Sequence, residues 1–475
     1  MQISCVNYKK LDQGTRLDAE YYKPEFLEVE KILWKANCKL LDDVSKSIKS
    51  FGAYALCNKM VLVAKGIPFI RCKDIKKGFV DFSEVLFIDE ATHCLLSKSA
   101  ITPNIVMLTM SGSVGNSAIA DPTWKYPINS NQDIAKIETD DLINPYYLTV
   151  FFNTKYGKSQ TERLPIGSIQ QHIFLWQLKG LLIFTPSSKL QGLIAGIYCK
   201  VIKLLKDSDF FYQKAEQILL FELGLLNWKP KRRLSFVKNF SETQTGGRID
   251  AEYFQPMYEE IVDKISKRFN AKPIGEYNFI DVTTGQYSDN YTEKLSGLPY
   301  IRGTDLLSGT VKMDNLVYIA KEHQEKSKLA REGDVVVTRV GTIGLSARIP
   351  KECEGGTISD NLIRLRIKDD GLDTYFLALF LDSILGRSLM IRYSRGSVQQ
   401  RLNQETLKEI IIPILDRNIQ ANIALEVKDS HKLREQSRCL LDIAKRGVEM
   451  AIEKSEKDAQ NWIDEELRKL NFRVD

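Results

Sequence analysis

The chain has 475 residues, of which 43% are hydrophobic and 27% are charged. These values are ordinary for a soluble globular protein, and the length leaves room for about three domains. No run approaches the roughly 18 apolar residues that a membrane-spanning helix requires, so we expect no contact with a membrane. The net charge of +6 permits binding to nucleic acid but does not demonstrate it.

The cysteines and histidines do not follow the spacing of a metal site. The eight cysteines are scattered without a Cys-x-x-Cys pair, and the chain has four histidines. The N-terminus lacks the basic region and apolar core of a signal peptide. We therefore expect a cytoplasmic protein with reduced thiols and no zinc cluster.

An internal repeat is the strongest feature of the sequence. The string Arg-x-Asp-Ala-Glu-Tyr at residues 16–21 returns at residues 248–253, an offset of 232. The string Gly-Ser-x-Gln-Gln at residues 167–171 returns at residues 396–400, an offset of 229. The period is too long for a solenoid, whose units run about 20–50 residues. The repeat therefore indicates a duplicated domain with its connector.

Each half follows the same order of predicted elements. A short amphipathic helix comes first, followed by strands that Gly, Pro, Asn or Asp residues bound. A second helix then leads to the Gly-Ser-x-Gln-Gln string, and an apolar strand ends the domain. The predicted ranges are 26–33, 67–71, 85–88, 105–108, 146–152 and 181–184 in the first half, and 258–265, 298–302, 316–319, 335–338, 375–381 and 410–412 in the second.

Two connectors carry apolar residues at alternating spacings of four and three, which is the a/d pattern of a coiled coil. The pattern runs over residues 190–225, where Ser208 and Glu222 interrupt it, and over residues 419–451, where Ser430 and Ser437 fill two seam positions. Because neither seam is suited to face water, we expect the two helices to pack on each other as an antiparallel pair. The alternative is that each helix packs on its own domain.

These patterns predict an α+β fold with two homologous domains. We expect the first domain at residues 1–186, a central connector helix at 187–228, the second domain at 229–414 and a C-terminal connector helix at 415–475. The two helices are expected to form an antiparallel coiled coil that relates the domains by pseudo-twofold symmetry.

One string imitates an enzyme motif. Asn144-Pro145-Tyr146-Tyr147 resembles the Asn-Pro-Pro-Tyr motif of amino-methyltransferases, in which the Asn side chain and the prolyl carbonyl hold the target amino group. The second proline is missing, the other copy reads Asp-Thr-Tyr-Phe at residues 373–376, and no Gly-x-Gly loop precedes the string. We therefore interpret it as the N-terminus of a helix.

Duplicated strings hold the candidate contact residues. The Gly-x-x-Gly turns at residues 112–115 and 341–344 either present backbone amides to a phosphate or simply require positive φ. The Gly-Ser-x-Gln-Gln strings suit contacts with bases or phosphates, or else cap a helix. In the Ile-Arg-x-x-Asp strings at residues 70–74 and 301–305, Arg and Asp either form a structural pair or leave the Arg for binding. The candidates are Arg71, Lys73, Lys76, Lys77, Ser113, Ser168, Gln170, Gln171, Arg302, Thr304, Arg339, Thr342, Arg395, Ser397, Gln399, Gln400 and Arg401.

In this order, the duplicated strings resemble the specificity (S) subunits of Type I restriction–modification enzymes. The resemblance implies a sequence-specific DNA-binding subunit with two target-recognition domains, each reading one half of a bipartite asymmetric sequence in double-stranded DNA. It implies that the helices act as a spacer and dock two methyltransferase subunits, and that restriction subunits complete the complex. S-adenosylmethionine, ATP and Mg²⁺ would belong to those partners, and this chain would have no catalytic residue, cofactor or metal.

Two other readings remain open. One is a DNA-modifying enzyme with its own methyltransferase activity, and the other is a coiled-coil scaffold that does not bind DNA. No duplicated nucleophile with a paired base and no metal-ligand spacing supports the enzyme. If the chain binds DNA, we expect base choice to reside where the copies differ, at residues 73–77 against 304–308 and 116–129 against 345–357.

Overall fold

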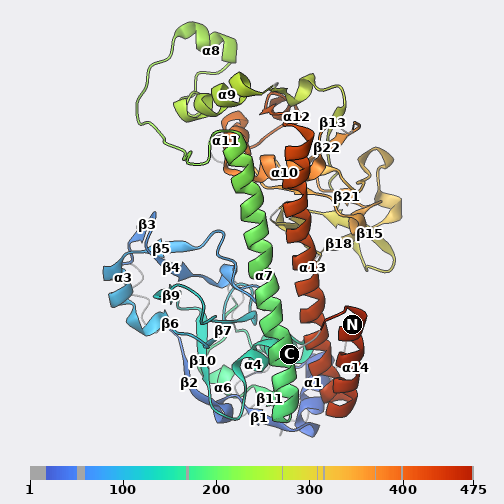
Figure 1. Cartoon of the computed structure of the whole chain (residues 1–475). Coiled ribbons are helices and arrows are strands. Elements are labelled where there is room, and N and C mark those ends of the chain that lie inside the picture. The colour runs from blue at the N-terminus through green and yellow to red at the C-terminus, as the bar shows by residue number, and fades with distance from the viewer. Residues whose placement is uncertain are drawn as a thin grey trace. The chain divides into compact units, whose positions relative to one another are not determined.

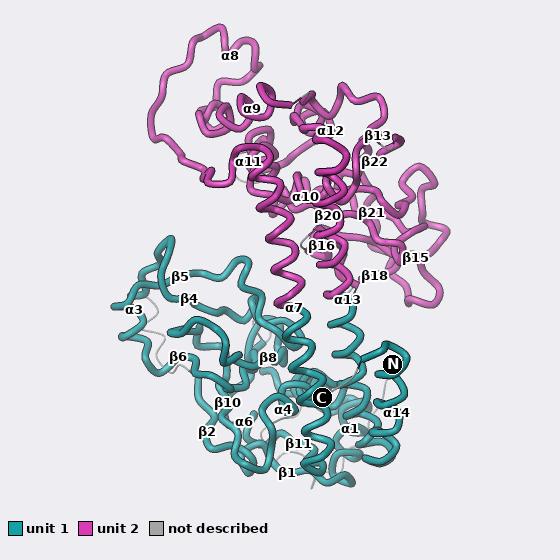
Figure 2. Tube along the Cα trace, in the orientation of Figure 1, with its two compact units in different colours: residues 1–205, 435–475 teal, residues 206–434 magenta. Residues whose placement is uncertain are grey.

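The computed structural model describes residues 16, 18–50, 59–166, 171–269, 271–307, 309–313, 316–369, 371–396 and 400–472. The chain forms two compact units (Figure 2), which comprise residues 1–205 with 435–475 (unit 1) and residues 206–434 (unit 2). The long helices α7 (Ser188–Glu222) and α13 (Arg417–Glu453), which Figure 1 labels, each contribute residues to both units.

Unit 1 contains a four-stranded sheet in the order β2-β10-β7-β8, a five-stranded sheet in the order β3-β5-β4-β9-β6 and the pair β1-β11. Its core cluster draws on both larger sheets, through Ile70 of β4, Met107 of β7 and Ile134 of β10. The strands are β1 (Cys38–Leu40), β2 (Ser45–Lys49), β3 (Leu62–Val63), β4 (Ile67–Ile70), β5 (Leu86–Ile88), β6 (Ala100–Ile101), β7 (Val106–Thr109), β8 (Ser117–Ile119), β9 (Ile128–Ser130), β10 (Ile134–Thr139) and β11 (Leu182–Phe184). The helices include α1 (Pro24–Lys35), α3 (Glu90–Leu95), α4 (Pro145–Phe152), α5 (Lys155–Arg163), α6 (Leu175–Lys179) and α14 (Glu456–Lys469).

Unit 2 has a similar topology, with one strand fewer in its second sheet and one additional strand pair. Its sheets follow the orders β13-β22-β19-β20 and β14-β18-β15-β21, with the pairs β12-β23 and β16-β17. The strands are β12 (Lys272–Pro273), β13 (Ile280–Thr284), β14 (Tyr291–Thr292), β15 (Gly297–Ile301), β16 (Leu306–Leu307), β17 (Thr310–Val311), β18 (Val317–Ala320), β19 (Val335–Thr338), β20 (Ser346–Arg348), β21 (Thr357–Ile358), β22 (Leu362–Ile367) and β23 (Ile411–Ile412). The helices include α8 (Phe240–Gly246), α9 (Pro256–Arg268), α10 (Thr374–Asp382), α11 (Ile384–Tyr393) and α12 (Gln404–Lys408).

Two glutamines at equivalent positions connect each long helix to a shorter helix of the same unit, α4 or α10. Gln191 of α7 accepts a hydrogen bond from the backbone N–H of Asn144 (2.8 Å) and donates to the carbonyl oxygen of Leu142 (3.1 Å). Gln420 of α13 accepts from the N–H of Asp373 (2.8 Å) and donates to the carbonyl oxygen of Gly371 (3.3 Å). These side chains fix the first turns of α4 and α10, and their match at an offset of 229 was the only sequence signal for this role.

The seam residues of α7 and α13 meet within each unit. In unit 2, the hydroxyls of Ser208 and Ser430 lie 3.1 Å apart, and both residues are fully buried. In unit 1, the Ser437 hydroxyl lies 3.4 Å from the carbonyl oxygen of Val201. The polar interruptions of the pattern therefore satisfy each other or the opposing backbone. Both helices also contribute residues to the hydrophobic core of unit 2, among them Leu219 of α7 and Ile423 of α13.

The C-terminal connector is two helices, and the prediction of one helix over 415–475 is wrong. The chain leaves α13 after Glu453 and starts α14 at Glu456. Ser455 adopts an extended conformation, and its hydroxyl accepts a hydrogen bond from the N–H of Asp458 at 3.1 Å. Carboxylates at residues 456 and 458 then lie in the first turn, where they interact favourably with the helix dipole.

Among the described residues no single helix is long and apolar enough to cross a membrane. The helices α10 and α11 reach the necessary length and apolarity only as a pair, which is bent by 68°. Residues of both helices belong to the hydrophobic core of unit 2.

Candidate nucleic-acid interface

Two duplicated strings lie side by side in unit 1. Ser111, directly before the Gly-x-x-Gly turn at residues 112–115, forms a backbone bridge with His172. His172 also pairs with Ile166, with N–H to carbonyl distances of 3.0 and 3.2 Å. The Gly-Ser-x-Gln-Gln loop between these two residues is thus joined at its ends to the glycine turn. Ser113 and Gln171 are both exposed there.

Unit 2 repeats the arrangement with different side chains. Val340, directly before the second glycine turn, pairs with Arg401, which also pairs with Arg395 through hydrogen bonds of 2.9 and 2.7 Å. Thr342, Arg395, Gln400 and Arg401 are exposed. The ends of the loop therefore present two arginines in unit 2, where unit 1 has Ile166 and His172.

The positive φ predicted for the glycine turns is confirmed, with φ of 67° and 75° at Gly112 and Gly115 and 78° and 94° at Gly341 and Gly344. A Cβ at Gly115 would lie 2.1 Å from Oγ1 of Thr161 in α5, so this glycine is also required by close packing. The threonine that ends the preceding strand donates to the turn in both copies, to Ser113 O at 2.5 Å and Thr342 O at 2.6 Å. Phosphate binding by these turns stays a prediction.

The helix-cap alternative for the Gly-Ser-x-Gln-Gln strings is wrong for the last glutamine of each. Gln171 and Gln400 precede the nearest helices, which begin at Leu175 and Gln404 with Phe174 and Asn403 as N-caps. The residues that flank each string pair with each other, Ile166 with His172 and Arg395 with Arg401, and the helix begins only after this pairing. The candidates Ser168, Gln170, Ser397 and Gln399 lie outside the described residues.

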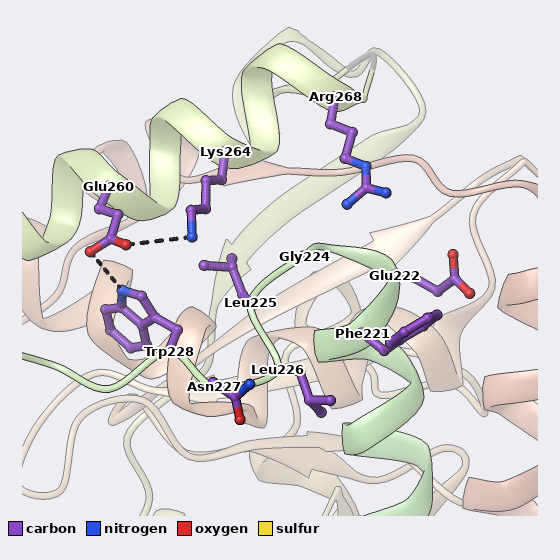
Figure 3. A pocket seen from close by; sticks show the side chains of 10 residues that line it. All are labelled: Phe221, Glu222, Gly224, Leu225, Leu226, Asn227, Trp228, Glu260, Lys264 and Arg268. Carbon is purple, nitrogen blue, oxygen red and sulfur yellow. Dashed lines mark hydrogen bonds and ion pairs between the residues drawn. The ribbon is translucent and has the colours of Figure 1, made fainter.

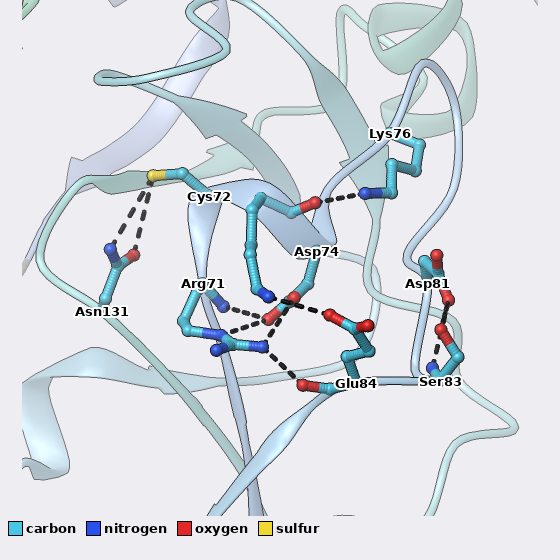
Figure 4. A network of polar contacts seen from close by, with 9 residues as sticks. Arg71, Cys72, Asp74, Lys76, Asp81, Ser83, Glu84 and Asn131 are labelled. Carbon is cyan, nitrogen blue, oxygen red and sulfur yellow. Dashed lines mark hydrogen bonds and ion pairs between the residues drawn. The ribbon is translucent and has the colours of Figure 1, made fainter. Parts of the chain in front are cut away.

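The Ile-Arg-x-x-Asp strings form structural pairs. Nε of Arg71 donates to the buried carboxylate of Asp74 at 3.0 Å (Figure 4), and Arg302 does the same to Asp305 at 3.1 Å. Each aspartate also accepts from the arginine's own backbone N–H at 2.9 Å. The hydrogen bond with Asp305 raises the pKa of Arg302. These arginines therefore hold the turn that follows β4 or β15.

The neighbouring cations differ in their surroundings. Lys73 is exposed and pairs with Glu84 at 2.9 Å, while Lys76 donates to the carbonyl oxygen of Lys73 (Figure 4). Lys77 and Thr304 are exposed. Sγ of Cys72 lies 4.0 Å from the Ser111 hydroxyl, which links this turn to the base of the glycine turn.

Arg339 is held by the backbone of unit 2. Its guanidinium donates to the carbonyl oxygens of Leu402 at 3.2 Å and Asp360 at 3.3 Å. Leu402 in turn donates its N–H to the carbonyl of Arg339 at 2.9 Å. Arg339 thus fixes the segment that follows the Gly-Ser-x-Gln-Gln loop.

The interpretation of Asn144-Pro145-Tyr146-Tyr147 as a helix start is confirmed. The Asn144 side chain accepts hydrogen bonds from the N–H groups of Tyr146 (2.9 Å) and Tyr147 (3.3 Å), and Pro145 begins α4. Its oxygen is therefore occupied by the helix end. Among the described residues, no three His, Cys, Asp or Glu side chains are grouped to hold a metal ion.

A buried cation occupies the same place in the sheet β2-β10-β7-β8 of unit 1 and the sheet β13-β22-β19-β20 of unit 2, and the sequence patterns missed it. Lys136 in β10 donates to the Ser130 hydroxyl at 2.9 Å, and burial lowers its pKa to about 8. Arg364 in β22 donates to the carbonyl of Leu329 at 2.7 Å and lies 3.9 Å from Asp334. The available signal was a charged residue directly between apolar neighbours, Ala135 and Ile137 in β10 and Ile363 and Leu365 in β22.

A pocket of about 560 Å³ lies in unit 2 between the end of α7 and α9 (Figure 3). Glu260 accepts from Nε1 of Trp228 at 3.3 Å and lies 3.5 Å from Nζ of Lys264, so these polar groups satisfy one another. None of the predicted candidates lines this pocket.

Known proteins match the chain at the level of family and structure. Residues 264–432 match the model of the Type I restriction modification DNA specificity domain. Among solved structures, the chain is similar to the S subunit of a Type I restriction-modification system from M. genitalium, at 15% identity, a TM-score of 0.40 and coverage of 88% of this chain and 95% of that one. It is also similar to the HsdS subunit from Thermoanaerobacter tengcongensis, at 14% identity, a TM-score of 0.29 and coverage of 88% and 96%. No curated protein matches the sequence. Residues 264–432 therefore belong to the family of Type I restriction modification DNA specificity domains, which confirms the resemblance found in the duplicated strings.

Proposed function

We propose that this chain is the DNA-recognition subunit of a Type I restriction–modification complex, in which each unit reads one half of a bipartite asymmetric sequence. The observation that carries the proposal is the duplicated interface. Each unit joins a glycine turn to a second loop by the same backbone bridges and exposes polar side chains from both. One scaffold with two sets of exposed residues suits two different half-sites.

The exposed residues favour different contacts in the two units. Arg395 and Arg401 flank the loop of unit 2 and suit phosphates or guanine edges. Unit 1 offers Ser113, Gln171 and His172, which carry less charge. Different half-sites imply a non-palindromic target, because a palindrome calls for two identical recognition surfaces.

The helices α7 and α13 are proposed to form the antiparallel coiled coil that the seams predict, with the two recognition domains related by pseudo-twofold symmetry. As a stiff spacer, this pair would set the separation of the half-sites and dock two methyltransferase subunits. Adding one helical turn would lengthen the spacer by about 5.4 Å, or roughly 1.5 base pairs of DNA. Restriction subunits would complete the complex, in the cytoplasm, where DNA is accessible.

The chain is proposed to be non-catalytic, with S-adenosylmethionine, ATP and Mg²⁺ bound by its partners. The engagement of the Asn144 side chain in capping α4 argues against a methyltransferase site in this chain. Methyl transfer by the purified chain with S-adenosylmethionine would refute this part of the proposal.

The modest net charge of +6 argues for weak DNA binding by the chain alone and tighter binding in the complex. Nanomolar binding of one specific duplex by the isolated chain in about 150 mM salt would contradict this expectation.

The proposal is tested by mapping methylated bases genome-wide in cells with and without this chain. We expect one bipartite motif to lose methylation when the chain is removed. Exchanging residues 1–186 for the same region of another specificity subunit should change one half of the motif only. An unchanged methylation pattern, or a change in both halves, would refute the model of one domain per half-site.

A further inference from the structure

The opening string of each half, Arg-x-Asp-Ala-Glu-Tyr, lies far in sequence from the candidate interface but touches it in space. In unit 1, the Arg16 guanidinium binds both carboxylate oxygens of Asp18, at 2.8 and 2.7 Å. It also donates to the carbonyl oxygens of Leu164 at 2.8 Å and Pro165 at 3.2 Å. These are the two residues before Ile166, where the first paired end of the loop begins.

Unit 2 makes the same contacts. The Arg248 guanidinium binds Asp250 at 2.7 and 3.0 Å and donates to the carbonyl oxygens of Arg392 at 3.4 Å and Ser394 at 3.1 Å. Ser394 directly precedes Arg395, the equivalent first end of the loop. A contact that recurs between residues 144 to 149 positions apart in both copies is a property of the duplicated domain.

The tyrosine of the string strengthens the connection from the other side. The guanidinium groups of Arg16 and Arg163 both lie over the Tyr21 ring, 4.5 and 4.1 Å from its centre, and Arg163 donates to the Tyr21 carbonyl at 2.8 Å. Arg248 and Arg392 likewise lie over the Tyr253 ring, at 4.7 and 4.8 Å. Stacked, hydrogen-bonded guanidinium groups hold a planar geometry that lysine does not reproduce.

Burial makes these contacts specific. The side chains of Arg16 and Arg248 are only 11% and 12% exposed. The carboxylate neutralises each guanidinium, and the remaining N–H groups donate to backbone carbonyl oxygens just before the loop. The residues directly before each loop are thereby fixed to the start of their domain.

We propose that Arg16 with Asp18, and Arg248 with Asp250, are positioning residues that fix the paired ends of the Gly-Ser-x-Gln-Gln loop for DNA recognition. The inference deepens the proposed function and rests on it for the DNA-binding part. The positioning itself is a property of each unit and is measurable without DNA.

The first test is hydrogen exchange on the full-length chain, resolved at the amides of Arg395 and Arg401 and at those of Ile166 and His172. Arg248→Gln should speed exchange of the first pair about tenfold or more and leave the second pair unchanged. Arg16→Gln should do the reverse, so each unit serves as the other's control.

Arg232→Gln provides a matched control within unit 2. Arg232 is 68% exposed and pairs with Glu252 of the same string. It makes no hydrogen bond to residues 392–401 among the described residues, so its loss should change exchange at neither pair. If Arg248→Gln fails to fold, Asp250→Asn weakens the same contact between Arg248 and residue 250. This variant should still raise the exchange rate at the amides of Arg395 and Arg401. Unchanged protection of these amides in folded variants, or an equal increase in both units, would overturn the inference.

The second test maps methylated sites in cells that carry each variant in the complete complex. Arg248→Gln should relax the base preference in one half of the motif and Arg16→Gln in the other. A merely structural role would lower methylation without changing the sequence preference, and this result would refute positioning for recognition. If exchange is faster but the methylated motif is unchanged, Arg16 and Arg248 still position the loop ends. The part of the proposed function that places DNA at these loops would then be refuted.

Discussion

Replacing Lys136 by methionine is expected to stabilise unit 1 at neutral pH. Lys136 is 5% exposed in the middle of β10, and its ammonium group donates to the Ser130 hydroxyl. Among the described residues, burial and the thiol of Cys72 act on its pKa, and no carboxylate does. A buried ammonium without a counter-charge loses its hydration, and this burial lowers the pKa of Lys136 to about 8.

The size of the effect follows from that pKa. The difference between the ordinary value of 10.5 and about 8 corresponds to about 3 kcal/mol of destabilisation at pH 7. Methionine removes this cost with a side chain of similar length. The lost hydrogen bond to Ser130 costs about 1 kcal/mol, since that hydroxyl keeps its bond to the Ser99 carbonyl at 3.2 Å. We therefore expect a net gain of about 1–2 kcal/mol in the free energy of unfolding.

The pH dependence gives the sharper signature. Between pH 8 and 10.5 the unfolded lysine keeps its proton while the folded lysine releases it, so the unfolded state binds more protons. The stability of the unmodified chain should therefore rise with pH across this window. Lys136→Met should lack this contribution to the rise, while it retains the same pH dependence below pH 8.

Urea unfolding at several pH values measures both effects, with Lys46→Met as the control. Lys46 lies in the neighbouring strand β2, and its side chain is 54% exposed, so its replacement should change stability little. A Lys136→Met chain that is less stable than the parent at pH 7, or one with an unchanged slope between pH 8 and 10.5, would refute the reasoning.

Substitutions at three further places test packing and pairing. Gly115→Ala should lower the free energy of unfolding, measured with urea, by about 2–4 kcal/mol, because its Cβ would overlap Thr161 at positive φ. Gly112→Ala, with open space around its Cβ, should lower it by only about 1 kcal/mol. Ser208→Ala or Ser430→Ala alone should each cost about 1–2 kcal/mol, and a double-mutant cycle should show that the pair costs less than the sum of the singles. Additive costs would contradict the contact between these hydroxyls. Arg71→Ala should destabilise unit 1 by about 2–4 kcal/mol because it leaves a buried carboxylate without its cation; a loss of DNA binding at unchanged stability would instead assign this arginine to recognition.

Local elements followed closely from the sequence. The strand predicted over residues 335–338 is β19 with the same bounds, and the proline-led helix predicted near residue 146 is α4, which begins at Pro145. Periodicity and capping residues act within a few positions, so a short window contains the information that decides such elements. The apolar pattern predicted one continuous helix over residues 415–475. It did not reveal that Ser455 is extended and separates α13 from α14.

The candidate site was predicted only in part. Arg71 and Arg302 were candidates for DNA contact because they are cationic and lie in duplicated strings. In the structure, their guanidinium groups bind buried aspartates of their own turns. The Gly-Ser-x-Gln-Gln string has residues that suit a helix cap, but its ends pair across the loop, and the helix starts later. Side-chain type shows what a residue is able to bind, whereas its actual partner depends on which segment folds beside it.

The sequence by itself determined the duplication, the α+β character and the two long helices, because each leaves a periodic or repeated trace along the chain. Only the tertiary structure decided that the opening string, the glycine turn and the Gly-Ser-x-Gln-Gln loop meet in each unit. It also decided that Ser208 contacts Ser430, so that the polar residues that interrupt the two separate apolar patterns form one buried contact. The physical reason is that contacts between distant segments arise from packing of the whole domain, and no local pattern records which segments that packing brings together.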